Sequence, residues 1–321
     1  MFIVLAHNSF NSRINGMNGW CLMFNKHSTE QRDRYEFARD FFSAYPEKLE
    51  MAEKYLMRCI SETLMDFRDE FRDDYNEANY LFPFWGSYPP SDRGRKPVGD
   101  QVPWIEVGEH SIGHRVERLM GSRFAIREIG MPSGTDDRFL LSNSRLKDIL
   151  EVTSSVMVFL DVKSSGPRES HDDLVVSPYQ VSGDGVWGAA FPSITNTIVD
   201  VSGSRADNQF QPAISPVLCL SDGTIAPVIH LFLKTIYTMI QDDENNTIGQ
   251  PLQLIKLACL PNGIELFVNP GLHFSNRGLL YPGKDERKTP LEKRRARVSL
   301  IKLQEIDAWR VVEVDCVSIG L

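Results

Sequence analysis

The chain has 321 residues, 42% of them hydrophobic, which is enough for one large domain or two small ones with a substantial core. A formal net charge of −8 argues against a surface that is basic throughout, and five scattered cysteines with no C-x-x-C pair argue against a cysteine-built zinc site or a disulfide framework. No apolar run reaches the ~18 residues of a membrane span, so we expect a soluble, cytoplasmic protein with no membrane partner.

Residues 1–22 differ from the rest of the chain. They carry one charged residue, Arg13, and show no clear periodicity. The opening apolar run lacks a basic segment before it and is cut short by polar residues at 7–9, so it is a poor signal peptide. We expect an N-terminal extension that is disordered or that comes from a start codon placed too early, followed by a single domain over 23–321.

The first half of this domain is expected to be helical. Apolar residues recur every three or four positions over 31–80, with charged residues between them and a break or a first helical turn at Pro46. Residues 82–104 are rich in proline, glycine and aromatics and are expected to form a loop, and a further helix is predicted over 109–119.

Strands are expected from Phe124 onward. Short apolar runs over 124–130 and 138–142 are followed by the strongest predicted strand, SSVMVFLDVKS, and later by an apolar run over 221–237 and by two more predicted strands within 296–320. Residues 252–271 are interpreted as a hairpin that turns at Pro261-Asn262-Gly263. Helices followed by strands with no internal repeat predict one compact α/β domain.

Two opposite charges interrupt the end of the strongest strand. Asp161 and Lys163 are two positions apart, so on a strand they project from the same face, with Val162 on the other. A carboxylate there can hold Mg²⁺, and the ammonium can act on an attacking water and on developing negative charge. Of twelve lysines only Lys163 and Lys288 have an acid two positions before them, and only Lys163 follows an apolar strand. The alternative interpretation is a solvated strand tip.

A second acid lies upstream of this pair. Asp136 precedes Asp161 by 25 positions and comes just ahead of the apolar segment RFLL, which is where a partner carboxylate on an adjacent strand would be expected. The sequence GTDD is equally typical of a turn stabilised by aspartate side chains.

A basic segment occupies residues 284–297. It contains 7 basic and 3 acidic residues, a balance of +4, whereas residues 30–77 contain 14 acidic and 8 basic residues, a balance of −6. A local basic patch on an acidic protein can still hold phosphate, because salt screens charges beyond ~8 Å. The alternative is an ordinary solvated face.

Several longer strings resemble the BglI family of type II restriction endonucleases. They include YPPSDRGRKPVGDQVPWIEVGE, VKSSGPR, SDGTIAPVIHLF and YPGKDERK, and the resemblance runs from about residue 23 almost to the end of the chain. It implies the PD-(D/E)xK fold, a central mixed sheet flanked by helices. It also implies a homodimeric, Mg²⁺-dependent nuclease that cuts double-stranded DNA at the interrupted palindrome GCCNNNNNGGC with 3′ overhangs. A protecting DNA methyltransferase would be its functional partner.

The resemblance also implies roles for individual residues. The catalytic set is Asp136, Asp161 and Lys163, with Asp136, Asp161 and the backbone carbonyl of Val162 as metal ligands. The base-reading set is Lys284, Glu286, Arg295, Arg297 and Glu169. Glu169 and Glu286 stand where the family has aspartates, which keeps the carboxylate acceptor on a longer side chain. Glu109 is a candidate outer acid, or else the capped start of a helix.

The residue chemistry agrees with these implied roles. Arginine and lysine pair with guanine and a carboxylate accepts from cytosine, so a G·C half-site requires this mixture. Two alternatives remain: another nuclease of the same fold, such as a junction resolvase or repair enzyme, and a non-catalytic DNA-binding protein.

Overall fold

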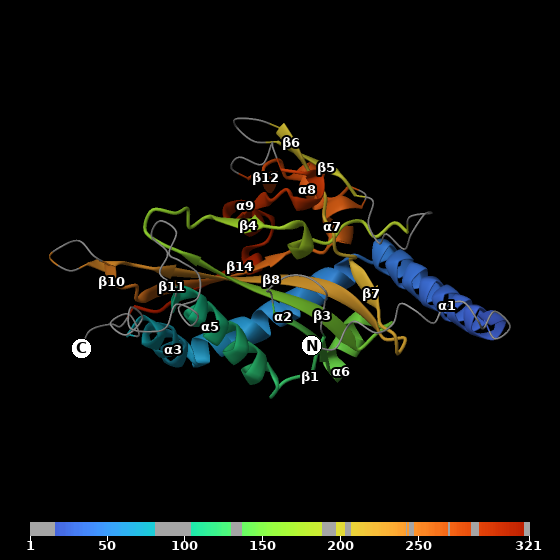
Figure 1. Ribbon diagram of the computed structural model, residues 1–321, viewed down its shortest axis with the longest axis horizontal. Coiled ribbons are helices and arrows are strands. Elements are labelled where there is room, and N and C mark those ends of the chain that lie inside the picture. The colour runs from blue at the N-terminus through green and yellow to red at the C-terminus, as the bar shows by residue number, and fades with distance from the viewer. Residues whose placement is uncertain are drawn as a thin grey trace, which may run out of the picture.

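The computed structural model describes residues 17–80, 104–129, 137–187, 197–202, 207–241, 243, 247–268, 270–283 and 289–317. Within them, a mixed sheet lies between a layer of long helices and a second, smaller layer of short strands and helices (Figure 1).

Three long helices form the first layer, namely α2 (Glu47–Asp66), α3 (Arg68–Tyr80) and α5 (Trp104–Met120). The long helix α1 (Met17–Ala44) contacts β7 and β8 and projects outward from that end of the sheet (Figure 1). The expected helices over 31–80 and the break at Pro46 are confirmed, because Pro46 is the N-cap of α2. Helix α1 begins at Met17 and therefore crosses the expected boundary at residue 23. None of the helices in the described residues is both long and apolar enough to cross a membrane.

The central sheet has the strand order β1-β2-β3-β8-β11-β14, with β7 paired to β8 outside this path. Among the described strand pairs of this sheet, only β3–β8 is parallel. The strands are β1 (Ala125–Glu128), β2 (Asp137–Ser142), β3 (Ser155–Ser165), β7 (Val217–Cys219), β8 (Ile225–Tyr237), β11 (Leu252–Leu260) and β14 (Val311–Asp315). The short helix α6 (Ser144–Leu150) connects β2 to β3. The strands expected near 124–130, 138–142 and 154–164 are confirmed.

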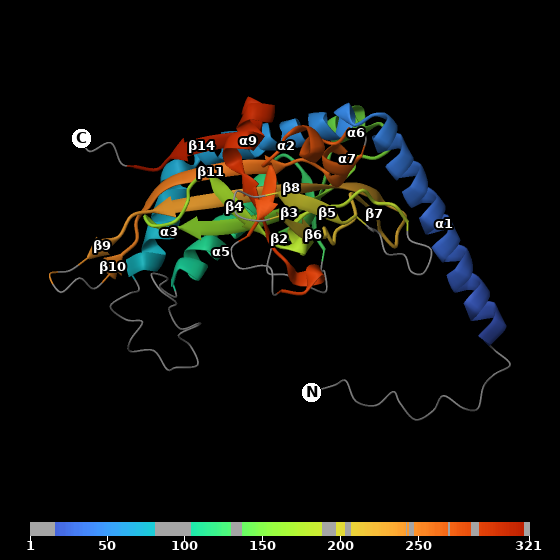
Figure 2. The same cartoon turned by 90° about the horizontal axis from the view of Figure 1, so that it is seen from above.

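The second layer contains a three-stranded sheet and the two-stranded sheet β5–β6. The three-stranded sheet, β12-β13-β4, is named the recognition sheet after the predicted base-reading role of Arg297 on its middle strand. Its strands are β4 (Asp173–Val176), β12 (Leu280–Pro282) and β13 (Ala296–Ser299). Its other elements are β5 (Val199–Ser202), β6 (Asp207–Phe210), α7 (Gly263–Phe267), α8 (Leu272–Ser275) and α9 (Leu300–Ile306). The short strands β9 (Ile240–Gln241) and β10 (Thr247–Gly249) pair with each other at the end of β8 and β11, outside this layer (Figure 1). Figure 2 shows β4 crossing over the β3–β8 part of the central sheet.

Alternate residues of β3 pack into different cores. Val156, Val158 and Leu160 belong to the main core between the sheet and the long helices. Met157 and Phe159 point to the other face, into a small cluster with residues of β2 and β8. This alternation is the two-residue period of a strand buried on both faces, which explains why the sequence reads as one continuous apolar run.

The expected hairpin at Pro261-Asn262-Gly263 is wrong. Residues 263–267 form helix α7 because Asn262 caps it: the Asn262 side chain accepts a hydrogen bond from Ile264 N at 3.0 Å, and Glu265 accepts from Asn262 N at 3.2 Å. This Asn-x-x-Glu pattern is a capping box that the sequence already contained. β11 instead pairs with β8 and β14.

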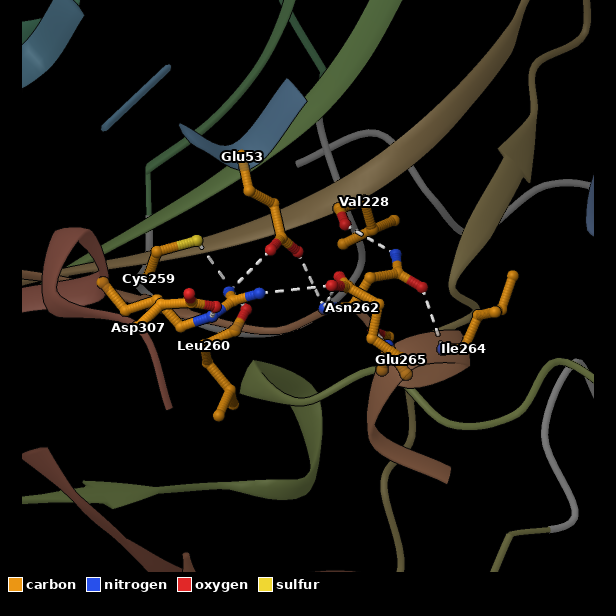
Figure 3. A network of polar contacts seen from close by, with 11 residues as sticks. Glu53, Val228, Cys259, Leu260, Asn262, Ile264, Glu265 and Asp307 are labelled. Atoms are coloured by element: carbon orange, nitrogen blue, oxygen red, sulfur yellow. Dashed lines mark hydrogen bonds and ion pairs between the residues drawn. The ribbon is translucent and has the colours of Figure 1, made fainter. Parts of the chain in front are cut away.

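A buried ion network joins α2 to the second layer (Figure 3). Arg310, in the 3₁₀ turn Ala308–Arg310, lies 2.7 Å from Glu53 and 3.1 Å from Glu265, measured between guanidinium nitrogens and carboxylate oxygens. Arg310 is 1% exposed and Glu53 is 0% exposed. Burial and the neighbouring Glu53 carboxylate raise the pKa of Glu265 well above its ordinary value. The Glu53–Arg310 pair at the centre of the network is therefore sealed from solvent, while Asp307, whose Oδ2 lies 3.6 Å from Arg310 Nε, forms its half-exposed edge.

Candidate active site

The structure places Asp161 and Lys163 side by side on β3. Lys163 Nζ lies 2.5 Å from Asp161 Oδ2, as the two-residue spacing predicts. The Lys163 side chain is 30% exposed and the Asp161 side chain is 10% exposed. The residues of β3 are buried up to Asp161 and half-buried directly after it. The pair thus lies where the strand emerges from the core, with the carboxylate sheltered and the ammonium within reach of a ligand.

The backbone of Val162 lies beyond the end of the described β2–β3 register. Lys163 O accepts a hydrogen bond from Thr235 Oγ1 of β8 at 3.3 Å. Successive carbonyls of a strand alternate between its two edges, so the Val162 carbonyl points to the β2 edge. The described register between β2 and β3 ends at Asp137 and Leu160, before Val162 is reached. A carbonyl at this position can act as a ligand.

Two further lysines continue the row that Lys163 begins. The strand register pairs Lys163 with Lys234 on β8 and Lys234 with Lys256 on β11. Lys256 contacts Asp172 at 3.2 Å and Glu313 at 2.9 Å. Sequence analysis did not single out Lys234 or Lys256, although a lysine in the middle of an otherwise apolar strand was a visible signal.

Lys234 connects β8 to the segment that follows β3. Its ammonium donates to the backbone carbonyls of Ser170 and Asp173. Burial lowers the pKa of Lys234 to about 8, against the charges of Asp173 and Glu169, which raise it. Lys163 is the member of the row with the most accessible ammonium, since Lys234 is 4% and Lys256 8% exposed.

The recognition sheet has one buried and one open face. The buried face packs onto the second core through Leu174, Val176, Leu280, Ala296 and Val298. The open face carries half-buried residues, namely Asp173, Val175, Tyr281, Arg297 and Ser299. The open face is polar and has Arg297 in the middle strand.

The two arginines predicted to read bases lie at this sheet. Arg297 is in β13, where its Nη1 lies 2.6 Å from Asp173 Oδ1. Arg295 immediately precedes β13 and is exposed. The expectation that this segment is a strand is confirmed from Ala296 onward.

Glu169 lies between the active-site strand and the recognition sheet. Its carboxylate accepts from Gly166 N at 3.2 Å, and its own N–H donates to Gly166 O at 3.1 Å. Glu169 is therefore held in the tight turn after β3, exposed to solvent.

Several predicted site residues lie outside the described residues or are described only in part. Asp136, Lys284 and Glu286 lie outside the described residues.

Glu109 belongs to α5, whose start at Trp104 rules out the interpretation of Glu109 as a helix cap. α5 packs on the main-core face of β3, opposite to Asp161. Among the described residues no three acidic, histidine or cysteine side chains are grouped to hold a metal, and the predicted pair needs Asp136.

Comparison with known proteins gives one consistent result. The sequence model of the family described as restriction endonuclease BglI matches residues 30–314. The type II restriction enzyme BglI of Bacillus subtilis is 45% identical over 298 residues, which cover 91% of this chain and 99% of that enzyme.

Solved structures agree. The crystal structure of the restriction endonuclease BglI bound to its DNA recognition sequence matches with a TM-score of 0.81 at 44% identity, covering 91% of this chain and 99% of that one. The tetrameric restriction endonuclease SfiI bound to cognate DNA matches with a TM-score of 0.55 at 14% identity over 85% and 86% of the two chains, which indicates a shared fold. The predicted α/β restriction-endonuclease-like fold, with a central mixed sheet flanked by helices, is confirmed.

Proposed function

Because this chain belongs to the BglI family of restriction endonucleases and is therefore a type II site-specific deoxyribonuclease, we propose that it binds duplex DNA and hydrolyses phosphodiester bonds at the interrupted palindrome GCCNNNNNGGC, leaving 3′ overhangs. The observation that carries the chemistry is the Asp161–Lys163 pair where β3 leaves the core. The recognition sheet, which is connected to this strand through Lys234, supports the assignment of sequence reading to Arg295 and Arg297.

The residues of this site fit a hard divalent cation, Mg²⁺. Asp161 offers a sheltered carboxylate and Val162 a backbone carbonyl, both oxygen ligands of the kind Mg²⁺ prefers. If the β2–β3 ladder continued by one residue, position 136 would stand opposite Asp161 on the same face, so we propose Asp136 as the third ligand. When bound, Mg²⁺ would supply positive charge to the scissile phosphate and lower the pKa of a bound water.

Lys163 and Asp161 would divide the remaining work. The Lys163 ammonium would donate hydrogen bonds to the attacking water or to a phosphate oxygen, stabilising negative charge as it develops. Asp161 would hold that ammonium in place as well as serve as a ligand, since it lies within contact distance of Nζ.

Base reading would come from the recognition sheet and its flanking segments. Arg295, Arg297 and Lys284 would donate to guanine, and Glu169 and Glu286 would accept from cytosine N4. Glu169 is held in the turn after β3, so this contact would bring the DNA backbone close to the active-site strand.

The palindrome also implies an assembly. A site with two-fold symmetry is matched by a two-fold symmetric protein, so we propose a homodimer, with one half-site read by each protomer. A DNA methyltransferase of the same restriction-modification system would protect host DNA. The four described cysteines are free thiols, which fits action on DNA in the reducing cytoplasm.

A plasmid digest tests this function. Purified protein with Mg²⁺ should cut a plasmid containing GCCNNNNNGGC at that site and leave 3′ overhangs, and excess EDTA should stop cutting. A matched plasmid with one G·C pair of the site changed is the control. Cutting of both plasmids alike, nicking only at junctions, or cutting in EDTA would overturn the proposal.

A further inference from the structure

Asp173, the first residue of β4, uses both carboxylate oxygens on the open face of the recognition sheet. Its Oδ1 accepts from Arg297 Nη1 at 2.6 Å, and its Oδ2 accepts from the Tyr281 hydroxyl at 3.0 Å. The three residues come from the three strands of the sheet, and Tyr281 stands directly opposite Arg297 in the register. The Asp173 and Arg297 side chains are 13% and 27% exposed, so the carboxylate lies below the arginine.

The backbone of Asp173 is fixed as well. Its carbonyl accepts from the buried ammonium of Lys234 on β8, next in register to Lys163. The preceding residue, Asp172, contacts Lys256 on β11. Asp173 is thus anchored to the central sheet through its main chain while its side chain holds the recognition sheet.

Tyr281 has the character of a fixed donor. Burial, with the nearby Asp173 charge, raises the pKa of Tyr281 to about 12. The hydroxyl therefore keeps its proton at neutral pH and directs it to Oδ2, which leaves Oδ1 oriented toward Arg297.

We propose that Asp173 is a positioning residue for specificity, which with Tyr281 sets the guanidinium of Arg297 in the plane needed to read guanine. This inference rests on the proposed function. Bidentate recognition of guanine requires a fixed guanidinium, and arginine is otherwise flexible over four side-chain torsions. Arg297 donates to Asp173 Oδ1 through Nη1, and a guanidinium carries five N–H donors, so donors remain for guanine O6 and N7.

The test is position-by-position discrimination in Tyr281→Phe and Asp173→Asn. Single-turnover cleavage is measured on the cognate duplex and on duplexes with one substituted base pair at each position of the half-site. We expect discrimination to fall by roughly 3- to 10-fold, the effect of one hydrogen bond, at one base pair only, and that pair to be the one relaxed by Arg297→Ala. Tyr281→Phe in the Arg297→Ala background should cause no further loss there.

Tyr179→Phe is the matched control, since Tyr179 is exposed and outside the recognition sheet, and it should cleave as wild type. Equal loss at every base pair, or unchanged discrimination, in a folded Tyr281→Phe protein would overturn the positioning role. Tyr281→Phe decides the question even if Asp173→Asn does not fold. Wild type that does not cut the cognate duplex at all would instead overturn the proposed function, and the inference with it.

Discussion

The molecule contains two kinds of charge cluster, and they differ in how far their side chains are exposed to solvent. Glu53 and Arg310 are buried and Glu265 beside them is 7% exposed, and Glu53 and Arg310 are 257 residues apart in the chain. Asp161 and Lys163 are two residues apart on one strand, and the lysine is 30% exposed. The Asp173–Arg297 pair resembles the second kind, with the arginine more open than its carboxylate.

This difference separates structure from function. In a sealed ion pair such as Glu53–Arg310, the counter-ion is another protein group and not water, so the loss of one member leaves a buried charge without its partner. In a half-open pair water can replace the lost member, so folding is affected little, while a ligand that needs the open cation loses its contact. The predictions below test this contrast, from the largest expected effect to the smallest.

Removing the cation of the sealed network should have the largest effect. Arg310→Met leaves Glu53 and Glu265 facing each other in the core, and we expect the free energy of unfolding to fall by about 3–5 kcal/mol. Urea unfolding followed by circular dichroism measures it. Arg127→Met is the matched control, because Arg127 pairs with Asp222 on the surface and should cost under about 1 kcal/mol. An equal fall in the free energy of unfolding in Arg310→Met and Arg127→Met would contradict the contrast between buried and surface pairs.

Removing the cation of the half-open active-site pair should act on rate. Lys163→Ala should cleave the cognate duplex ~10²–10³-fold more slowly, because an electrostatic contact to developing charge is lost, while cognate binding in Ca²⁺ changes little. Single-turnover cleavage and filter binding separate the two. Lys302→Ala, a surface lysine paired with Glu305, is the control. Near-normal cleavage by Lys163→Ala would assign the chemistry elsewhere.

The contact between Asp161 and Lys163 was predictable from sequence because its geometry is local. A strand period of two fixes Asp161 and Lys163 on one face wherever the strand lies. The sealed network was not predictable, since Glu53 and Arg310 meet only after α2 packs on the sheet. The row of Lys163, Lys234 and Lys256 depends on the strand order and register, which one sequence does not reveal.

Helix α7 shows a different kind of failure. Its signal was local and present, an Asn-x-x-Glu capping box, but Pro-Asn-Gly between two apolar runs is an equally strong signal of a hairpin turn. The side-chain amide of Asn262 decides between them, because it also donates to the carbonyls of Pro216 and Val228 at 2.8 Å. Those partners come from distant parts of the chain.

Removing the exposed Arg295, beside the recognition sheet, should have a smaller effect than removing Arg310 or Lys163. Arg295→Ala is expected to weaken cognate binding by ~1–3 kcal/mol per half-site and to relax preference at one base pair. Filter binding to cognate and substituted duplexes measures both. Lys293→Ala, exposed in the same segment, is the control and should weaken all duplexes alike if it contacts phosphate. Full preference retained by Arg295→Ala would remove it from the base-reading set.

His230 is a buried titratable side chain without a counter-ion, and its effect on stability can be measured through pH. His230 packs against the Phe159 ring at 5.4 Å between centroids, and within the described residues neither of its ring nitrogens has a hydrogen-bond partner. Burial lowers the pKa of His230 to about 3, so the folded protein keeps it neutral while the unfolded chain takes up a proton below about pH 6.5.

Stability from this group is therefore fully present above pH 6.5 and is lost as the pH falls toward 3. Between pH 7.5 and 5.0 the loss should be roughly 2 kcal/mol, and His230→Leu should remove that part of the pH dependence. Urea unfolding of both proteins at the two pH values measures the difference. The same pH dependence in His230→Leu as in wild type would show that His230 does not contribute to it.

The most direct test puts both charge clusters through both assays. Lys163→Ala and Arg310→Met are each measured for free energy of unfolding and for single-turnover cleavage of the cognate duplex, below the unfolding transition. The account predicts a crossed result: Lys163→Ala unfolds like wild type, within about 0.5 kcal/mol, and cleaves ~10²–10³-fold more slowly, while Arg310→Met is less stable and cleaves normally per folded molecule. A Lys163→Ala protein that loses stability as Arg310→Met does, or that cuts at the wild-type rate, would contradict it.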